Sequence, residues 1–518
     1  MSGDKRLISR REVFRIGAAG GMALVAKPGR AKDMSGKTNR RPNVLFVNTD
    51  QQRFDALSCA GNPCVSTPNL DRLASEGVRF TSAVTPSAMC IPARCAWATG
   101  LSIHATGCIN TTDPKSMDFH SGSFDQNLAK AGYHTEYHGR YHAPLPLAEC
   151  YKNPITLGFT KPYQAHLKKT LGEPPACKDG ELVGLLAKWP YKPDPLDARF
   201  ANIWPDHPEY QGCIHFGTTS VPAEHTYSAY VADQTIDALK RLKDVPFSIT
   251  SAFLAPHHPW YLPKRWAGSV DPKKMREPAT LNDKRENTPY SDFFWQLPEV
   301  YRKHLGLFHA RYYELLQEAD YHIGRILKAL DDLGLAENTL VIFAADHGEM
   351  LGDHGLTQKF VAYQESIRIP MMMRLPGKIA AGKLVDHPAS SVDIFATIFD
   401  YLGLECPPQH GNSVRPLVEG RTDDYPDYVF SEFGLDAGIG YISFISRQWK
   451  YVWTLAPGAM DMLYNIEEDP HELNNLLGAN PDREKHLPKA REIRKAMLDR
   501  MEQIKHPYLE KLAASEIG

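Results

Sequence analysis

The sequence predicts an α/β protein in which a mostly parallel central sheet is flanked by helices, with a smaller α+β subdomain at the C-terminal end. Two apolar runs of strand length, residues 43–49 and 339–345, each stop at an acid, Asp50 and Asp346. Such runs are typical of parallel strands that helices cover on both faces. Before the second run lies a long proline-free stretch with apolar residues at helical spacing, residues 301–335. Strands that alternate with helices favour a parallel sheet.

The other elements of the large domain follow in chain order. Residues 67–74 have the pattern of a capped helix start, and residues 124–131 predict a second short helix. Residues 246–255 predict another buried strand, which runs into His257. Residues 163–226 are rich in Pro, Trp, Tyr and His and carry few periodic signals, so we expect long loops there.

The C-terminal part of the chain has a different pattern. Short β-like runs at residues 428–433, 441–445 and 449–455 precede a polar amphipathic stretch at residues 482–503. We therefore expect residues 406–518 to form a subdomain with a small antiparallel sheet and a helix.

The composition of the 518-residue chain is that of a globular protein with a sizeable core. It has 59 Lys and Arg against 61 Asp and Glu, and 42% of its residues are hydrophobic. These values exclude disorder, collagen and coiled coil. Because no block of five or more like charges occurs, we expect neither nucleic acid nor an anionic membrane surface as a partner.

The first 31 residues have the pattern of an export signal. Residues 9–15 read Ser-Arg-Arg-Glu-Val-Phe-Arg, and the apolar stretch that follows, residues 16–26, is too short to span a bilayer. The segment resembles a twin-arginine signal, with Ala26 or Ala31 as the cleavage point and residues 32–41 as a linker. The alternative is an N-terminal surface helix.

This signal predicts the Tat export machinery as a partner and the periplasm as the destination, with secretion as the alternative. We expect no membrane association of the mature form, because no other segment has the ~18 apolar residues of a membrane helix. The nine cysteines are an odd number in a compartment that permits disulfides, so one of them can have another role.

The run Cys90-Ile91-Pro92-Ala93-Arg94 predicts a helix start with reactive chemistry. Proline is tolerated in the first helical turn, which places Cys90 at the positive end of the helix. Arg94, four residues on, shares its face. A helix N-terminus next to a guanidinium is an anion site, so a nucleophile there meets an anionic substrate. The alternative is a structural cysteine.

The carboxyl ends of parallel strands meet at one edge of a sheet, where ligands collect. Asp50, His257 and Asp346 each follow a predicted strand and are expected to lie at that edge. Taken singly, either acid can equally be a helix cap or a turn former.

The pattern Cys-x-Pro-x-Arg, followed by Thr99-Gly100, is similar to the signature of the type I sulfatases, members of the alkaline-phosphatase-like superfamily. Further segments in the family's order are Asp50-Gln51, Thr67-Pro68-Asn69-Leu70-Asp71, Gly139-Arg140-Tyr141-His142, Pro256-His257-His258-Pro259, Asp346-His347-Gly348, His354-Gly355 with Lys359, and residues 365–370 and 463–470. The resemblance spans residues 42–480. It implies an alkaline-phosphatase-like fold, with residues 42–405 as the catalytic domain, and hydrolysis of sulfate esters.

The resemblance also implies two cofactors. Cys90 is expected to be oxidised to formylglycine (3-oxoalanine) by a formylglycine-generating enzyme. The implied ligands of one divalent cation are Asp50, Gln51, Asp346, His347 and the oxidised Cys90. Their oxygens suit Ca²⁺, and the histidine leaves Mn²⁺ or Mg²⁺ open. The pairs Asp50-Gln51 and Asp346-His347 are a variant that resembles choline sulfatases and phosphonate monoester hydrolases.

The implied mechanism uses a hydrated aldehyde at position 90 as the nucleophile, with a nearby carboxylate such as Asp346 helping its deprotonation. The implied groups that stabilise charge on the sulfuryl oxygens are the cation, Arg94, Lys359 and Arg140, the last in place of the family's lysine. His257, beside Lys359, is the expected acid for the departing alcohol, and His142 the base that expels sulfate. The alternative for His142 is a buried histidine bonded to backbone, and for Lys359 and His258 a solvated surface residue.

Three functions remain open. The favoured one is a sulfatase that acts on sulfated carbohydrate. The second is a phosphonate monoester or phosphodiester hydrolase, or a choline-sulfatase-like enzyme for small molecules. The third is a carbohydrate-binding protein without catalysis, which would follow if Cys90 remains a thiol.

Overall fold

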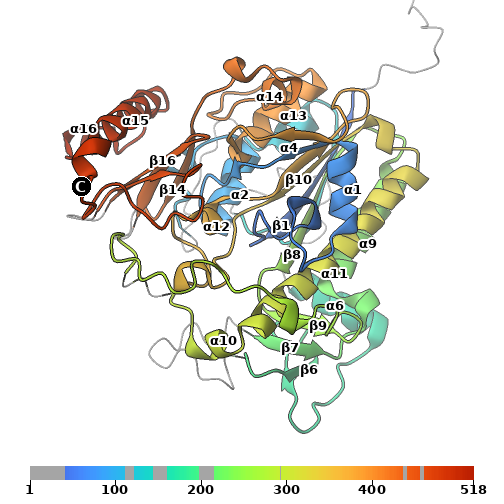
Figure 1. Cartoon of the computed structure of the whole chain (residues 1–518). Helices are drawn as coiled ribbons and strands as arrows, with labels where there is room; N and C mark the ends of the chain where they lie inside the picture. Colours follow the sequence, from blue (N-terminus) through green and yellow to red (C-terminus); the bar gives the residue numbers. More distant parts are fainter. Residues whose placement is uncertain are drawn as a thin grey trace, which may run out of the picture. The chain divides into compact units, whose positions relative to one another are not determined.

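The central sheet has seven strands among the described residues, in the order β12-β2-β11-β10-β1-β8-β4 (Figure 1). In chain order these are β1 (Asn43–Asp50), β2 (Val78–Phe80), β4 (His134–Gly139), β8 (Phe247–Pro256), β10 (Thr339–Ala345), β11 (Met371–Arg374) and β12 (Lys383–Val385). The four strands β10, β1, β8 and β4 pair in parallel, while β11 runs antiparallel to both of its neighbours. The predicted mostly parallel sheet is confirmed.

The computed structural model describes residues 41–110, 122–143, 160–197, 215–291, 293, 295–435, 440–455 and 460–518. Residues 41–518 form one compact unit. The predicted export signal, nearly all of its linker, and Cys150 and Cys213 lie outside the described residues. The seven described cysteines are free. Within the described ranges, no helix is both long and apolar enough to cross a bilayer.

Helices cover the central strands on both faces, which explains why every residue of β1 is buried. The helices α1 (Pro68–Glu76), α9 (Tyr227–Leu242) and α11 (Leu305–Asp332) form one layer, with α9 and α11 against β8 (Figure 1). The opposite layer contains α2 (Cys90–Thr99), α4 (Phe124–Lys130) and α13 (Ile394–Leu402). The predicted helices at residues 67–74, 124–131 and 301–335 therefore correspond to α1, α4 and α11.

The C-terminal subdomain is a four-stranded antiparallel sheet, β14 (Val429–Phe433), β15 (Tyr441–Ile445), β16 (Trp449–Thr454) and β17 (Met462–Asn465). The helices α15 (Arg483–Gln503) and α16 (Leu509–Ala514) follow it, and residues of both belong to a second hydrophobic core with this sheet. This confirms the expected small sheet and helix, whereas the domain boundary at residue 405 stays a prediction.

The prediction of long loops at residues 163–226 is wrong for the described part of that region. It contains α6 (Lys161–Leu171), β5 (Leu182–Val183), β6 (Pro190–Pro193) and β7 (Phe216–Thr219), and these strands form a sheet with β9 (Trp260–Pro263). Strands of two to four residues are too short to show an alternation of apolar and polar side chains, so the sequence pattern did not reveal them. The remaining short elements are β3 (Ala83–Val84), α3 (Ile103–Thr106), α10 (Glu299–Lys303), α12 (Gln364–Ile367), β13 (Ala389–Ser390) and α14 (Arg415–Glu419).

A glycine lets β4 end close against β8. Gly139 has φ +103°, and a Cβ there would lie 2.0 Å from the carbonyl oxygen of Ala252. The next residue, Arg140, donates its backbone N–H to the same oxygen at 2.9 Å. Gly139 thus positions the first residue of the Arg140-Tyr141-His142 segment.

We predict that Gly139→Ala lowers the free energy of unfolding by about 2–4 kcal/mol, because the added methyl collides with backbone and the φ angle is unfavourable for alanine. Gly132→Ala is the matched control, since Gly132 also has positive φ, +95°, but no atom within 4 Å of its Cβ position. The control should lose only about 1–2 kcal/mol. Chemical denaturation of both variants measures the difference, and equal losses would contradict the close approach.

Candidate active site

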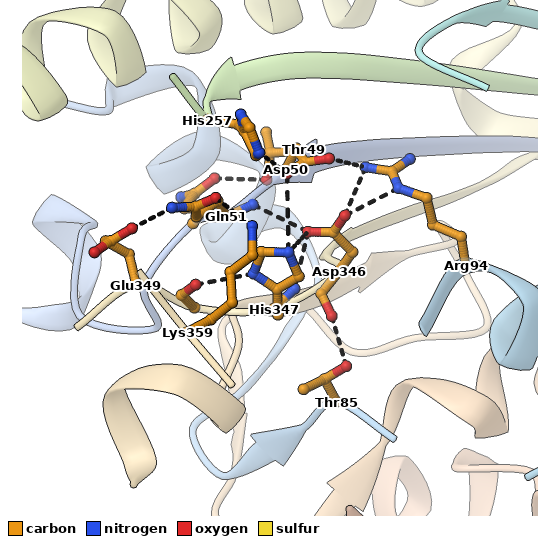
Figure 2. A network of polar contacts seen from close by, with 12 residues as sticks. Thr49, Asp50, Gln51, Thr85, Arg94, His257, Asp346, His347, Glu349 and Lys359 are labelled. Atoms are coloured by element: carbon orange, nitrogen blue, oxygen red, sulfur yellow. Dashed lines mark hydrogen bonds and ion pairs between the residues drawn. The ribbon is translucent and has the colours of Figure 1, made fainter. Parts of the chain in front are cut away.

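Three strand ends bring polar residues to one point (Figure 2). Asp50 is the last residue of β1, His257 directly follows β8, and Asp346 directly follows β10. His257 Nε2 lies 3.9 Å from Asp50 Oδ1, and the backbone N–H of Gln51 donates to Asp346 Oδ1 at 3.0 Å. The expected meeting of these residues at the carboxyl edge of the sheet is confirmed.

Helix α2 supplies Cys90 and Arg94 to the same point. Cys90 is the first residue of the helix, preceded by an extended N-cap at Met89. Arg94 is 2% exposed, and its guanidinium lies 3.0 Å from Asp50 Oδ2 and 2.9 Å from Asp346 Oδ2. Its Nη1 also donates to Asn48 Oδ1 at 2.9 Å. The guanidinium therefore holds the two acids side by side.

The two carboxyl groups are fully buried, and the pKa values of Asp50 and Asp346 are shifted in opposite directions. Burial alone would raise the pKa of Asp50, but neighbouring cations led by Arg140 hold it well below its usual range. Burial and the adjacent Asp50 carboxylate raise the pKa of Asp346 to about 6. A divalent cation between them would favour the ionised form of both.

The residues present fit such a cation. Asp50, Asp346 and His347 each offer one ligand atom, and these atoms lie within 4.8 Å of one another. Asp50 Oδ1 and His347 Nε2 are buried and make no hydrogen bond within the described chain. The His347 Nδ1 atom lies 2.9 Å from the carbonyl oxygen of Gly348, to which an Nδ1–H donates. The lone pair of His347 is then on Nε2, 3.7 Å from Asp346 Oδ1, as a metal ligand requires.

A second cluster, His104, Glu432 and His506, has similar spacing but a different proton arrangement. The backbone N–H of Tyr508 donates to Nδ1 of His506 at 3.1 Å, so the proton of the neutral ring is on Nε2, 3.4 Å from Glu432. Burial alone would raise the pKa of Glu432, but His104 and His506 lower it to about 2. We interpret this cluster as a hydrogen-bonded carboxylate rather than a metal site.

Cys90 lies next to the candidate cation site. The thiol is 4% exposed, and it lies beside the His347 ring. Burial alone would raise the pKa of the Cys90 thiol, but His347 and Lys359 lower it below the usual value. The expected nucleophile, Cys90, is therefore next to a proposed metal ligand, His347.

Gln51 lies between Lys359 and Glu349. Its Oε1 accepts from Lys359 Nζ at 2.7 Å, and its Nε2 donates to Glu349. Gln51 has φ 63°, an unfavourable backbone conformation for a residue other than glycine. Lys359 is 4% exposed, so the alternative of a solvated surface residue is wrong. Gln51 as a metal ligand stays a prediction.

Arg140 and His142 reach the site from the segment after β4. Arg140 Nε lies 3.2 Å from Asp50 Oδ2, and Arg140 Nη2 lies 2.8 Å from His142 Nδ1. Burial and Arg140 lower the pKa of His142 to about 3, so the ring is neutral at neutral pH. A neutral imidazole can accept a proton, but His142 must release the Arg140 contact to do so at Nδ1.

His257 and His258 are stacked, with ring centroids 4.3 Å apart. Burial and the His258 ring lower the pKa of His257 well below its usual range. His258 is 9% exposed, so it is not the solvated residue that the sequence analysis considered. The positively charged residues that also lower the pKa of His257 are Arg140 and Lys359.

Comparison with known proteins agrees with this geometry. The family model described as Sulfatase matches residues 42–404, and one described as N-sulphoglucosamine sulphohydrolase, C-terminal, matches residues 352–506. This chain belongs to the sulfatase family. The resemblance given by the motifs around Cys90 is confirmed.

Relatives of this sulfatase include an arylsulfatase of Clostridium perfringens, 29% identical over 459 residues, which cover 86% of this chain and 92% of the relative. An N-acetylglucosamine-6-O-sulfatase of Bacteroides thetaiotaomicron is 24% identical over 510 residues, covering 85% and 83% of the two chains. Among solved structures, the phosphonate monoester hydrolase SpPMH of Silicibacter pomeroyi has a TM-score of 0.72 at 24% identity, covering 90% of this chain and 97% of that one.

Several residues that support the site of this sulfatase were missed by sequence reasoning. Asn48 binds Arg94, Thr85 donates its hydroxyl to the carbonyl oxygen of Asp346 at 2.5 Å, and Glu349 holds Gln51. One signal was available, because Asn48 and Asp50 are two apart on a strand and share a face. Thr85 lies in a loop that no periodic pattern marks.

The loop that carries Lys359 has a strained backbone. Leu351, His354, Gln358 and Phe360 have φ angles of 49°, 51°, 67° and 83°. Positive φ at residues other than glycine costs about 1–3 kcal/mol each, and such strain clusters at functional sites. The surrounding fold thus stabilises an unfavourable loop that presents the Lys359 ammonium beside the candidate cation site.

We predict that the purified sulfatase binds about one divalent cation per chain and that His347→Ala lowers the affinity at least about a hundredfold, since it removes a ligand. His506→Ala, in the second cluster, is the matched control and should keep the wild-type affinity. Metal analysis after dialysis against Ca²⁺ or Mn²⁺ measures both. A cation lost with His506 and kept without His347 would contradict the assignment of the two clusters.

Proposed function

We propose that this sulfatase hydrolyses sulfate esters of sulfated carbohydrates. The reaction would use a formylglycine made from Cys90 together with one bound divalent cation, for which Ca²⁺ is our first candidate. The observation that supports this most strongly is the position of Cys90, which is the first residue of α2 and lies beside His347 of the Asp50, Asp346 and His347 cluster. Helix N-termini favour anions, so an anionic ester bound there would meet the side chain of residue 90.

The two cofactors define what the chain must supply. Once oxidised and hydrated, residue 90 would provide a hydroxyl nucleophile, and the cation would favour its ionised form. Asp50, Asp346 and His347 would hold the cation. The chain's own residues then position these groups, exclude water, and donate or accept protons.

Arg94 is assigned to positioning. Its guanidinium is engaged by Asp50, Asp346 and Asn48, so it orients the acids and has few donors left for the sulfuryl group. Lys359 and Arg140 are the cations that we assign to the sulfuryl oxygens, a preorganised electrostatic role. Arg140 has a planar guanidinium in place of the compact ammonium of the family's lysine, so its contacts with substrate differ from the family's.

We propose that the leaving alcohol lies next to His257 and Lys359. Because burial lowers the pKa of His257, its neutral ring does not supply the proton that the leaving alcohol needs. We propose that Lys359 supplies it and that His257 orients the leaving oxygen. His142 remains the proposed base for the step that releases sulfate.

The carbohydrate substrate is supported by the N-acetylglucosamine-6-O-sulfatase relative. A phosphonate or phosphate-diester substrate is the second candidate, favoured by the Asp346-His347 pair and by the tautomer that makes His347 a cation ligand. Turnover of a sulfated saccharide panel, an aryl sulfate and an aryl phosphonate by the same preparation separates the two.

We further propose that the Tat machinery exports the protein to the periplasm and that a formylglycine-generating enzyme matures it.

We predict that the peptide containing Cys90 carries the mass of an aldehyde in protein from its native host, and that Cys90→Ala lowers sulfate-ester turnover at least about a thousandfold with an unchanged fold. Cys95→Ala, on the same helix, is the control and should retain turnover. Peptide mass spectrometry and kinetics test this. An unmodified thiol would indicate the non-catalytic alternative, and activity in Cys90→Ala would refute the covalent mechanism.

We also predict that Lys359→Ala lowers turnover of a saccharide sulfate about 10²–10⁴-fold but that of 4-nitrophenyl sulfate much less, because 4-nitrophenolate leaves without a proton. Arg140→Ala serves as the comparison, since loss of charge stabilisation should affect both substrates equally. Equal losses on both substrates in Lys359→Ala would limit Lys359 to the sulfuryl oxygens and contradict its role as the acid for the leaving alcohol.

A further inference from the structure

A cavity adjoins the candidate active site at His257. It is lined by residues from α6, from the start of α9 and the segment before it, from the end of β8, from β9 and from α11, and they include Tyr163, Thr226, Tyr227, Tyr261, Glu318 and His257. His257 lines this cavity and also lies 3.9 Å from Asp50 through Nε2. The cavity is therefore on the side of the site to which we assign the leaving alcohol.

Glu318 is an unusual residue in this cavity. The side chain is 1% exposed. Its Oε1 accepts from the hydroxyl of Thr226, the N-cap of α9, but its Oε2 makes no hydrogen bond within the described chain. A buried carboxylate oxygen without a donor costs free energy, which a suitable ligand would recover.

Among the described residues that line the cavity, none is a lysine or an arginine that could balance Glu318. The basic group in ion-pair range among the described residues is His322, whose Nε2 lies 3.5 Å from Oε1. Burial, together with Arg325 and Arg265, lowers the pKa of His322 to about 3, so that ring is neutral. Burial correspondingly raises the pKa of Glu318 to about 7. A cationic group of a ligand would favour the carboxylate form.

The aromatic residues of the lining suit an organic ammonium group. Tyr163 and Tyr227 meet edge to face with centroids 5.3 Å apart, and Tyr261 is a third ring in the lining. The Tyr163 hydroxyl donates to the carbonyl oxygen of His225. Aromatic rings attract ammonium groups, most strongly where water is excluded. Three rings and one carboxylate are the usual composition of a site for a positively charged nitrogen.

We propose that this cavity binds a positively charged nitrogen on the alcohol part of the sulfate ester, as present in an amino sugar or a quaternary amino alcohol. The inference rests on the proposed function, because it takes the leaving alcohol to lie beside His257. A role limited to capping α9 would need one oxygen of Glu318, and the second oxygen would then have no function.

The test compares substrates that differ in charge and little in shape. The first pair is choline O-sulfate and its neutral isostere 3,3-dimethylbutyl sulfate, and the second is glucosamine 6-sulfate and glucose 6-sulfate. We expect kcat/KM to favour the cationic member of at least one pair by about tenfold or more. The pair with the larger ratio identifies the source of the nitrogen.

Glu318→Gln keeps the size of the side chain and an oxygen for Thr226. In this variant the ratio of kcat/KM for the cationic substrate to that for its neutral partner should fall to within about twofold of one. Turnover of 4-nitrophenyl sulfate should stay near wild type. Glu314→Gln is the matched control, since Glu314 is a buried acid one turn away on α11 that accepts from the backbone N–H groups of Gly268 and Val270. It should retain the cationic preference.

Stabilisation by tetramethylammonium, measured as a shift in Tm for wild type and Glu318→Gln, provides a readout that does not depend on turnover. The wild type should be stabilised and the variant should not. Turnover of 4-nitrophenyl sulfate without any preference for cationic substrates and without this shift would overturn the cavity assignment alone. Absence of turnover on every sulfate ester would instead refute the proposed function.

Discussion

The site depends on two carboxylates that the fold forces together in a fully buried position. β1 and β10 are parallel neighbours, so their carboxyl ends place Asp50 and Asp346 side by side, and both are fully buried. Like charges in such a position destabilise each other unless cations neutralise them. Arg94 supplies one positive charge from α2, and a divalent ion beside His347 would supply the rest. Breaking a buried ion pair costs about 3–5 kcal/mol, so this arrangement constrains strand order, helix position and cofactor at once.

The sequence could predict the parts of this arrangement that follow from a strand end or a helix start. Asp50, His257 and Asp346 each close a strand whose apolar run is clear, and Pro92 indicates where the helix of Cys90 and Arg94 begins. The chemistry of the proposed formylglycine came from the resemblance, because a cysteine at a helix start has no unique function. The cation ligand set also came from the resemblance, and the tautomer of His347 could only be read from the hydrogen bond to Gly348.

Other parts could not be predicted because they depend on contacts between distant segments. β4 reads His-Thr-Glu-Tyr-His-Gly, which is too polar to resemble a buried strand, yet it pairs with β8 and carries Arg140 to Asp50. The ion pair between Arg140 and Asp50 and the strained loop before Lys359 are tertiary features. Glu318 lies on a helix that was predicted, but its unpaired oxygen depends on how the segment before α9 packs against that helix.

The two histidine clusters show why ligand spacing alone does not define a metal site. For His347 and His506, a backbone partner at Nδ1 sets which ring nitrogen carries the proton, and that proton decides between a metal ligand and a hydrogen-bond donor. Anomalous diffraction from crystals of the mature protein soaked in Mn²⁺ would distinguish the two clusters. The account predicts one strong peak about 2.0–2.4 Å from Asp50 Oδ1 and His347 Nε2, next to the side chain of residue 90. A peak between His104 and His506, with none beside Asp50, would contradict it.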